Sequence, residues 1–186
     1  MEKRTKEVRL REVRAIEEQE KMTIEGYAVV FDEPTDLGYI EVIERGALDN
    51  CDMSDVCLKY NHEDTTLIMA RTRNKSLQLS VDEHGLKIYA DLIDTQSNRD
   101  IYKSIQAGLL DKMSFAFIVS DANWDTVNGR DVRRIKGIEK LFDVSVVDVP
   151  AYDQTEVYAR SREAVEKEQE AYHEFEKEKL RIKLSL

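Results

Sequence analysis

Residues 112–119 have the sequence KMSFAFIV, and the alternation within this stretch decides how the chain folds around it. Successive side chains of a strand point to opposite faces, so Met113, Phe115 and Phe117 would share one face. Ser114 would lie on the other face, beside the small Ala116. The pattern therefore predicts a strand with an aromatic face to bury and with room beside a serine hydroxyl.

The chain on either side of this stretch alternates in the same way. Residues 6–16 and 22–31 are two such runs, separated by the polar sequence EEQEK, and they predict a hairpin. Residues 76–81 and 86–93 predict a second hairpin, in which Gly85 would adopt the positive φ that tight turns require. Further strands are predicted at 56–60, 132–138 and 141–149.

Three segments depart from the strand pattern. Residues 95–106 have apolar side chains at helical spacing, with Thr95, Ser97 and Asn98 as candidate N-caps, and they predict a helix that leads into the strand of Ser114. Residues 32–50 contain proline and glycine and predict a long surface loop. Half of the residues in 161–186 are charged, which predicts a solvated helix or an extension.

The composition indicates one globular domain. The 186 residues are 41% hydrophobic and 35% charged, and no apolar run approaches the roughly 20 residues of a membrane helix. We expect no membrane partner and, because the first residues lack the apolar stretch of a secretory signal, a cytoplasmic location. The net charge of −10 disfavours binding to nucleic acid, whose phosphates attract basic surfaces.

The cysteines and histidines do not have the spacing of a metal site. Cys51 and Cys57 are the two cysteines, and in a reducing compartment they are expected to be idle thiols. The three histidines are far apart in sequence, and no Cys-x-x-Cys pair is present. We therefore expect no metal and no cofactor.

Three residues near predicted strand ends have the chemistry of a serine hydrolase. A serine hydroxyl needs an imidazole to accept its proton, and a carboxylate can hold that imidazole in the right tautomer. His62, Ser114 and Asp143 are candidates for these roles. Each also has a plain structural interpretation, namely a loop histidine bonded to Asp64, a small strand residue and a surface carboxylate. A thiol mechanism through Cys57 and His62 is a further alternative.

Five segments around these residues resemble, in one consistent order, the tailed-phage prohead (capsid maturation) protease family. The resemblance extends from about Val8 to Tyr158 and includes the Asn-His context of His62 and the Met-Ser-Phe context of Ser114. The segments are 23–31, 41–48, 61–64, 112–117 and 143–152.

The resemblance implies an α+β fold that is mainly antiparallel β. The expected architecture is an assemblin-like β-barrel, closed or nearly closed and flanked by a few helices. Residues 1–160 would form the protease domain and residues 161–186 a charged helical C-terminal extension. Assemblin-like enzymes work as dimers, so the resemblance also implies a homodimer.

The implied function is a serine endopeptidase that cleaves the scaffolding portion from the major capsid protein, and then itself, inside the procapsid in the host cytoplasm. Ser114 matches the nucleophile and His62 the base. Asp143 lies where the family more often has Glu, so Asp148 or a water-mediated contact is an alternative orienter. A catalytically silent barrel that acts as a capsid-assembly module is the alternative function.

The donors that would stabilise an oxyanion are not identified by the sequence. Backbone amides near Ala116 and the side chains of Arg133 and Arg134 are candidates. Two adjacent arginines on a predicted strand more simply form a solvent-facing charge pair, which is the expectation we adopt for them.

Overall fold

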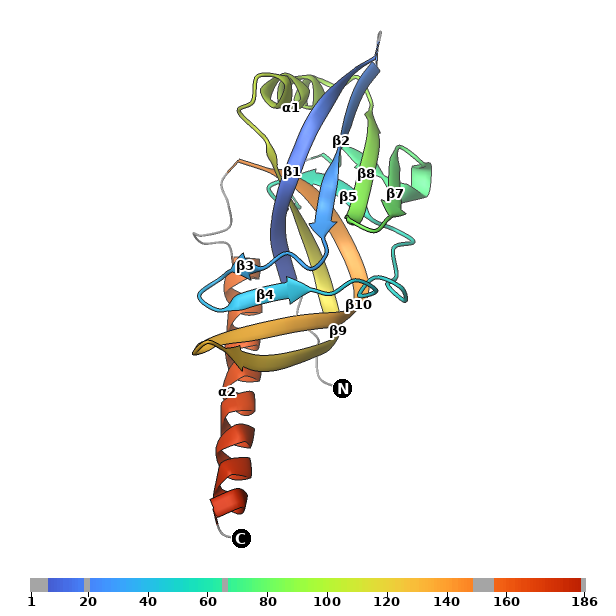
Figure 1. Ribbon diagram of the computed structural model, residues 1–186. Helices are drawn as coiled ribbons and strands as arrows, with labels where there is room; N and C mark the ends of the chain where they lie inside the picture. The colour runs from blue at the N-terminus through green and yellow to red at the C-terminus, as the bar shows by residue number, and fades with distance from the viewer. Residues whose placement is uncertain (1–6, 19–20, 65–66, 149–155, 185–186) are drawn as a thin grey trace.

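Ten strands form one sheet in the computed structural model, which describes residues 7–18, 21–64, 67–148 and 156–184 (Figure 1). The strand order is β3-β4-β10-β9-β1-β2-β8-β7, and β5 pairs with both β10 and β6. The elements are β1 (Glu7–Glu18), β2 (Lys21–Val30), β3 (Thr35–Asp36), β4 (Ile40–Ile43), β5 (Cys57–Tyr60), β6 (Ala70–Arg71), the 3₁₀ helix η1 (Thr72–Asn74), β7 (Leu77–Val81), β8 (Gly85–Leu92), α1 (Gln96–Gln106), β9 (Lys112–Val127), β10 (Arg130–Val147) and α2 (Glu156–Leu184).

Most neighbouring strands are antiparallel, and the exceptions both involve β10. Strands β4 and β5 each run parallel to β10, at different points along its length. Among the described strands, no pairing joins β3 to β7, the two ends of the main path. The α+β class with mostly antiparallel strands is confirmed, whereas closure into a barrel stays a prediction.

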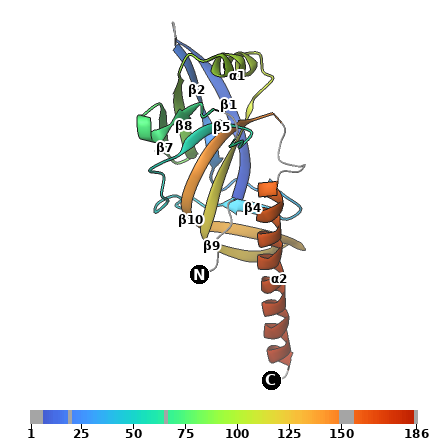
Figure 2. The same cartoon turned by 180° about the vertical axis from the view of Figure 1, so that it is seen from behind.

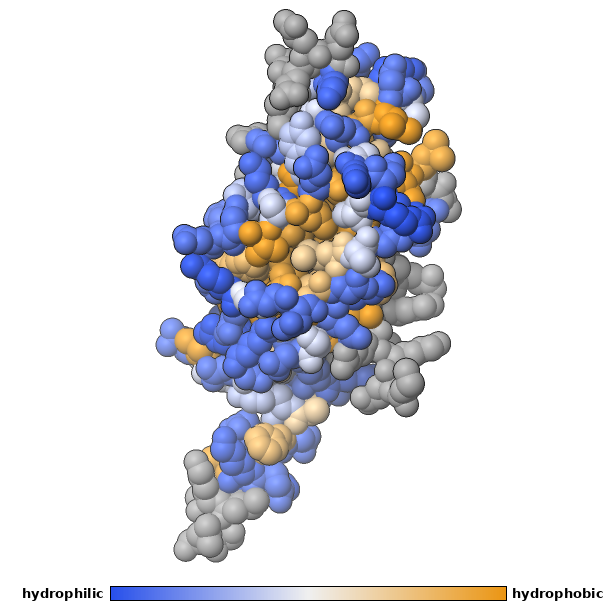
Figure 3. Space-filling view, turned by 90° about the vertical axis from the view of Figure 1, so that its right-hand side faces the viewer, coloured by the Kyte–Doolittle hydropathy of each residue, from blue (hydrophilic) through white to orange (hydrophobic). Residues whose placement is uncertain are grey.

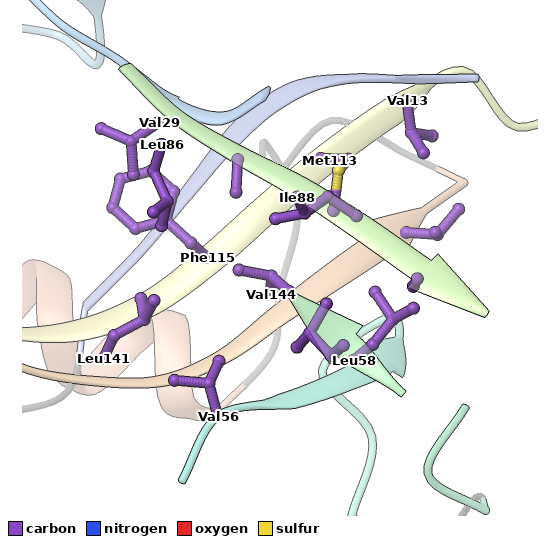
Figure 4. Packing of buried hydrophobic residues seen from close by; sticks show 14 of the residues in the cluster. Val13, Val29, Val56, Leu58, Leu86, Ile88, Met113, Phe115, Leu141 and Val144 are labelled. Carbon is purple, nitrogen blue, oxygen red and sulfur yellow. The ribbon is translucent and has the colours of Figure 1, made fainter. Parts of the chain in front are cut away.

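The hydrophobic core lies on one face of β9 and β10, where the aromatic face of the KMSFAFIV stretch was expected. Phe115 and Phe117 are fully buried, and their rings stack with centroids 4.7 Å apart. Figure 4 shows side chains of β8, such as Ile88, and side chains of β9 and β10 in one common interior. Because this face is used for packing, the opposite face of β9 and β10 is the one left for polar residues.

Strand β10 is longer than the sequence indicated, and part of a predicted loop forms strand β4. The two strands predicted at 132–138 and 141–149 are one strand, whose register against β9 shifts at several points between Ile135 and Asp143. Such bulges bend a strand without ending it. The prediction of a loop at 32–50 is wrong in part, because Ile40–Ile43 is a largely buried strand that pairs with β10. Val149 lies outside the described residues.

The first helix was predicted correctly, but the role given to a turn glycine was not. Thr95 caps α1, and its hydroxyl accepts a hydrogen bond from the Asn98 amide at 3.2 Å. Gly85 is not among the residues with positive φ. A side chain at this position would instead collide with β2, because a Cβ atom would lie 1.9 Å from the Val29 carbonyl oxygen.

Helix α2 contacts the sheet through a buried arginine. Arg133 is 1% exposed, which corrects its expected place in a solvent-facing pair. Its guanidinium lies 3.1 Å from a Glu41 oxygen and 2.7 Å from a Glu168 oxygen of α2, since a buried charge requires charged partners. Figures 1 and 2 both show the C-terminal half of α2 extending beyond the sheet.

The surface is predominantly hydrophilic with local apolar areas. Figure 3 shows one face on which hydrophobic residues gather at the centre and hydrophilic residues surround them. On the part of α2 that extends beyond the sheet, Phe175 and Leu180 are 65% and 56% exposed. Within the described ranges, neither helix has the length and apolar composition needed to cross a bilayer.

Candidate active site

The face of β9 and β10 opposite the core carries a row of small and polar side chains. Ser114 of β9 is the register partner of Ser145 of β10, and Asp143 lies two residues before Ser145 on the same face. On the other side of β10, Ser145 is the partner of Lys59 of β5. Directly paired residues have Cβ atoms about 5 Å apart, so these side chains form one cluster.

His62 reaches this cluster because the chain turns sharply after β5. Asn61 and His62 both have positive φ, at 51° and 57°, and asparagine and histidine are among the residues that tolerate this conformation best. The Asn61 amide donates to the Val146 carbonyl at 2.9 Å. The Asn61 Oδ1 atom accepts from the Asp148 amide at 3.2 Å. These two bonds fix the turn to the end of β10.

Asn61→Ala is expected to lower the free energy of unfolding by about 2 kcal/mol. Alanine would lose the bond to Asp148, worth about 1 kcal/mol, and would be disfavoured by roughly 1 kcal/mol in the left-handed region, which asparagine tolerates through local side-chain hydrogen bonds. Asn61→Gly should cost about half as much, because glycine adopts positive φ freely. Urea unfolding of both variants measures the difference, and equal losses would contradict this account of the turn.

The imidazole of His62 contacts the carboxylate of Asp143 directly. His62 Nδ1 lies 2.5 Å from Asp143 Oδ1, although the two residues are 81 positions apart in sequence. The Asp143 side chain is 0% exposed and that of His62 is 15% exposed. Ser145 Oγ donates to the same carboxylate oxygen at 2.9 Å and lies 3.2 Å from His62 Nδ1. An imidazole whose Nδ1 contacts a buried carboxylate has the geometry that a general base and its orienting carboxylate require.

Two buried polar atoms on this face have no hydrogen-bond partner among the described residues. They are His62 Nε2 and Ser114 Oγ. A buried polar atom without a partner costs about 1 to 3 kcal/mol, so such atoms are retained mainly where function uses them. The nitrogen that would accept a proton and the hydroxyl that would give it are therefore both left unbonded beside Ser145.

A lysine ammonium lies on the far side of the carboxylate. Lys59 Nζ is 3.9 Å from Asp143 Oδ2 and also forms an ion pair with Asp64. Burial lowers the pKa of Lys59, but the bond to Asp64 and the charges of both carboxylates outweigh burial and leave this pKa above its ordinary value. Lys59 therefore stays charged and favours the ionised form of Asp143.

The three predicted residues lie together in the structure, and the alternatives to them have other surroundings. The Asp148 carboxylate accepts a hydrogen bond from the Tyr60 hydroxyl at 2.9 Å. Burial raises the pKa of the Cys57 thiol, which disfavours the thiolate needed for cysteine chemistry. Arg133, which was a candidate oxyanion donor, is ten residues from Asp143 on β10, on the order of 30 Å along a straight strand.

Ser145 and Lys59 belong to the cluster, although no role was predicted for them from the sequence. For Ser145 a signal was present, because a residue two positions after Asp143 in a strand shares its face. Lys59 joins through the parallel pairing of β5 with β10, which no local pattern indicates. Within the described ranges, no group of three or more His, Cys, Asp or Glu side chains is placed to hold a metal ion.

Comparison with known proteins gives relatives both in sequence and in structure. The prohead protease of Escherichia phage T5 is 38% identical over 80 residues, which are 43% of this chain and 36% of that protein. The match thus spans only about a third of the relative's length. The capsid assembly protease of bacteriophage T4 shares the fold, with a TM-score of 0.51 and 10% identity over 77% of this chain and 98% of that one.

A family model connects the whole described site to one group of proteins. The model of the caudovirus prohead serine proteases (Peptidase_S78) matches residues 8–170, a range that contains His62, Ser114 and Asp143. This range is most of the 186 residues. The resemblance seen in the sequence is confirmed, and the chain belongs to the caudovirus prohead serine protease family.

Proposed function

We propose that the protein is a serine endopeptidase with Ser114 as nucleophile, His62 as general base and Asp143 as orienter. The observation that carries the proposal is the bond from Asp143 to His62 Nδ1, which leaves Nε2 without a partner on the face that also holds Ser114. Family membership supports the same activity.

In this mechanism, Ser114 Oγ attacks the carbonyl carbon of a peptide bond while His62 Nε2 accepts the hydroxyl proton. The imidazolium then gives that proton to the leaving amine, and an acyl-enzyme remains. Water, deprotonated by the same imidazole, attacks the ester and releases Ser114. Because Ser114 is 0% exposed, the mechanism requires the substrate to displace the part of the chain that covers it.

The substrate we propose is capsid protein that still carries its scaffolding segment, together with the protease itself. A related phage protein is described as a prohead protease and a fold relative as a capsid assembly protease, which supports a role in capsid maturation. Cleavage would take place inside the procapsid in the host cytoplasm. We further propose that residues 1–160 form the catalytic domain and residues 161–186 an extension of it.

The test is the intact mass of purified protein followed over time at neutral pH, alone and mixed with a capsid protein joined to its scaffolding segment. The wild type should shorten both chains, whereas Ser114→Ala should leave both intact. Ser80→Ala removes an exposed serine on β7 and should cleave as the wild type does.

A folded wild type that leaves every chain intact would contradict the proposal. The alternative function, a catalytically silent module of capsid assembly, would then be favoured. Circular dichroism of the variants establishes that each chain is folded, so that loss of cleavage is not mistaken for loss of structure.

A further inference from the structure

Ser145 occupies the centre of the candidate site although the proposed mechanism gives it no step. Its register partners are Ser114 on β9 and Lys59 on β5, and its side chain is 0% exposed. A buried hydroxyl is costly unless it is hydrogen-bonded, so its contacts indicate what it is there to do.

The contacts of Ser145 determine where the protons of the cluster lie. A hydroxyl has one proton and two lone pairs, whereas an ionised carboxylate can only accept. The proton of Ser145 Oγ therefore goes to Asp143 Oδ1, at 2.9 Å. A lone pair of the same oxygen then faces His62 Nδ1, at 3.2 Å.

Two acceptors thus surround one ring nitrogen. His62 Nδ1 has Asp143 Oδ1 at 2.5 Å and Ser145 Oγ at 3.2 Å, and both favour a proton on that nitrogen. In a neutral imidazole the other nitrogen is then the bare acceptor. The arrangement leaves Nε2 free to take a proton from Ser114.

The same contacts exclude Ser145 as an alternative nucleophile. Its oxygen lies against the nitrogen that carries a proton, and that nitrogen cannot remove another one. The two paired serines of β9 and β10 therefore have different relations to His62: one has a hydroxyl without a partner, and the other is bonded to the Asp143 carboxylate.

We propose that Ser145 is a positioning residue that holds Asp143 and His62 in the geometry and tautomer required for proton transfer from Ser114. The inference rests on the proposed peptidase activity and adds a residue to it. Ser145 does not touch the reacting atoms, and its effect is exerted through Asp143 and His62.

The main experiment compares Ser145→Ala with the wild type in steady-state cleavage of a peptide copied from a mapped cut site. We expect kcat to fall on the order of 10-fold to 100-fold with KM within about twofold, because the lost bond is made to a charged group. The hydroxyl stabilises the negative carboxylate, so its removal raises the proton affinity of the His62 and Asp143 pair. The acid limb of kcat/KM should therefore shift to higher pH.

Thr23→Val is the matched control. Thr23 is also 0% exposed, and its hydroxyl donates to the Asp91 carboxylate at 3.0 Å between β2 and β8. The Thr23→Val substitution also removes a buried hydroxyl that bonds a carboxylate, so it should lower the free energy of unfolding. It should leave both kcat and the pH profile unchanged. If Ser145→Ala does not fold, Ser145→Cys fills the same site with a weaker hydrogen-bond donor. The acid limb of its kcat/KM profile should then shift in the same direction by a smaller amount.

A second readout does not depend on cleavage. Nitrogen-15 NMR of the histidine rings, assigned with His62→Gln, should show the proton of His62 on Nδ1 in the wild type and a mixture of tautomers in Ser145→Ala. If the wild type cleaves nothing, the peptidase proposal fails and this measurement still decides the role of Ser145. An unchanged tautomer, or wild-type kcat with an unshifted acid limb, would overturn the inference.

Discussion

His62→Ala is expected to lower kcat about a million-fold, and adding Ser114→Ala to that variant is expected to cost nothing more. The hydroxyl is a weak nucleophile without a base, and the base has nothing to activate without the hydroxyl. Groups that act as one unit show this non-additive pattern, and the residual rate comes from oxyanion stabilisation and substrate binding. The measurement is kcat on a cut-site peptide for the two single variants and the double variant.

His84→Ala is the control for this series. His84 is exposed in the turn between β7 and β8, where its ring packs against Tyr27 with centroids 4.5 Å apart. Its loss should leave kcat within about twofold, as for other surface substitutions. If the losses from His62→Ala and Ser114→Ala multiplied in the double variant, the two residues would be acting independently and the proposed mechanism would be wrong.

Local sequence patterns predicted the strand that carries Ser114 and the helix that leads into it. The alternation around Ser114 placed Phe115 and Phe117 in the core and the serine on the opposite face, and the structure has this arrangement. Thr95, one of the three candidate caps, is the N-cap of α1. Both signals depend on residues within a few positions of one another, where the periods of strand and helix hold.

Strand pairings between segments that are distant in sequence could not be predicted in the same way. Strands β4 and β5 both lie parallel to β10, and parallel pairing requires a crossover that has no turn motif to mark it. This pairing brings His62 to Asp143 and adds Lys59 to the site. The burial of Arg133 depends similarly on Glu168 of α2, 35 residues away. Charge alone suggested exposure, and only the partners make burial tolerable.

Asp143→Asn is expected to lower kcat on the order of ten-thousand-fold while the protein stays folded. The carboxylate accepts from His62 Nδ1 at 2.5 Å and so keeps the proton on that nitrogen. An amide at this position can present its NH₂ group instead, which would place the ring proton on Nε2. His62 could then no longer accept a proton from Ser114, and this loss of the right tautomer has about the stated cost in comparable triads.

Asp148→Asn is the matched control, because the sequence left Asp148 open as an alternative orienter. Its carboxylate accepts from the Tyr60 hydroxyl at 2.9 Å and is exposed, so kcat should change less than threefold. Steady-state kinetics of both variants at neutral pH, with thermal unfolding to establish folding, measures the contrast. A loss below tenfold for Asp143→Asn would remove Asp143 from the triad, and a larger loss for Asp148→Asn would transfer the role to Asp148. Because Ser145 donates a hydrogen bond to Asp143 and Lys59 forms an ion pair with it, we expect the Asp143 carboxylate, and not that of Asp148, to be essential.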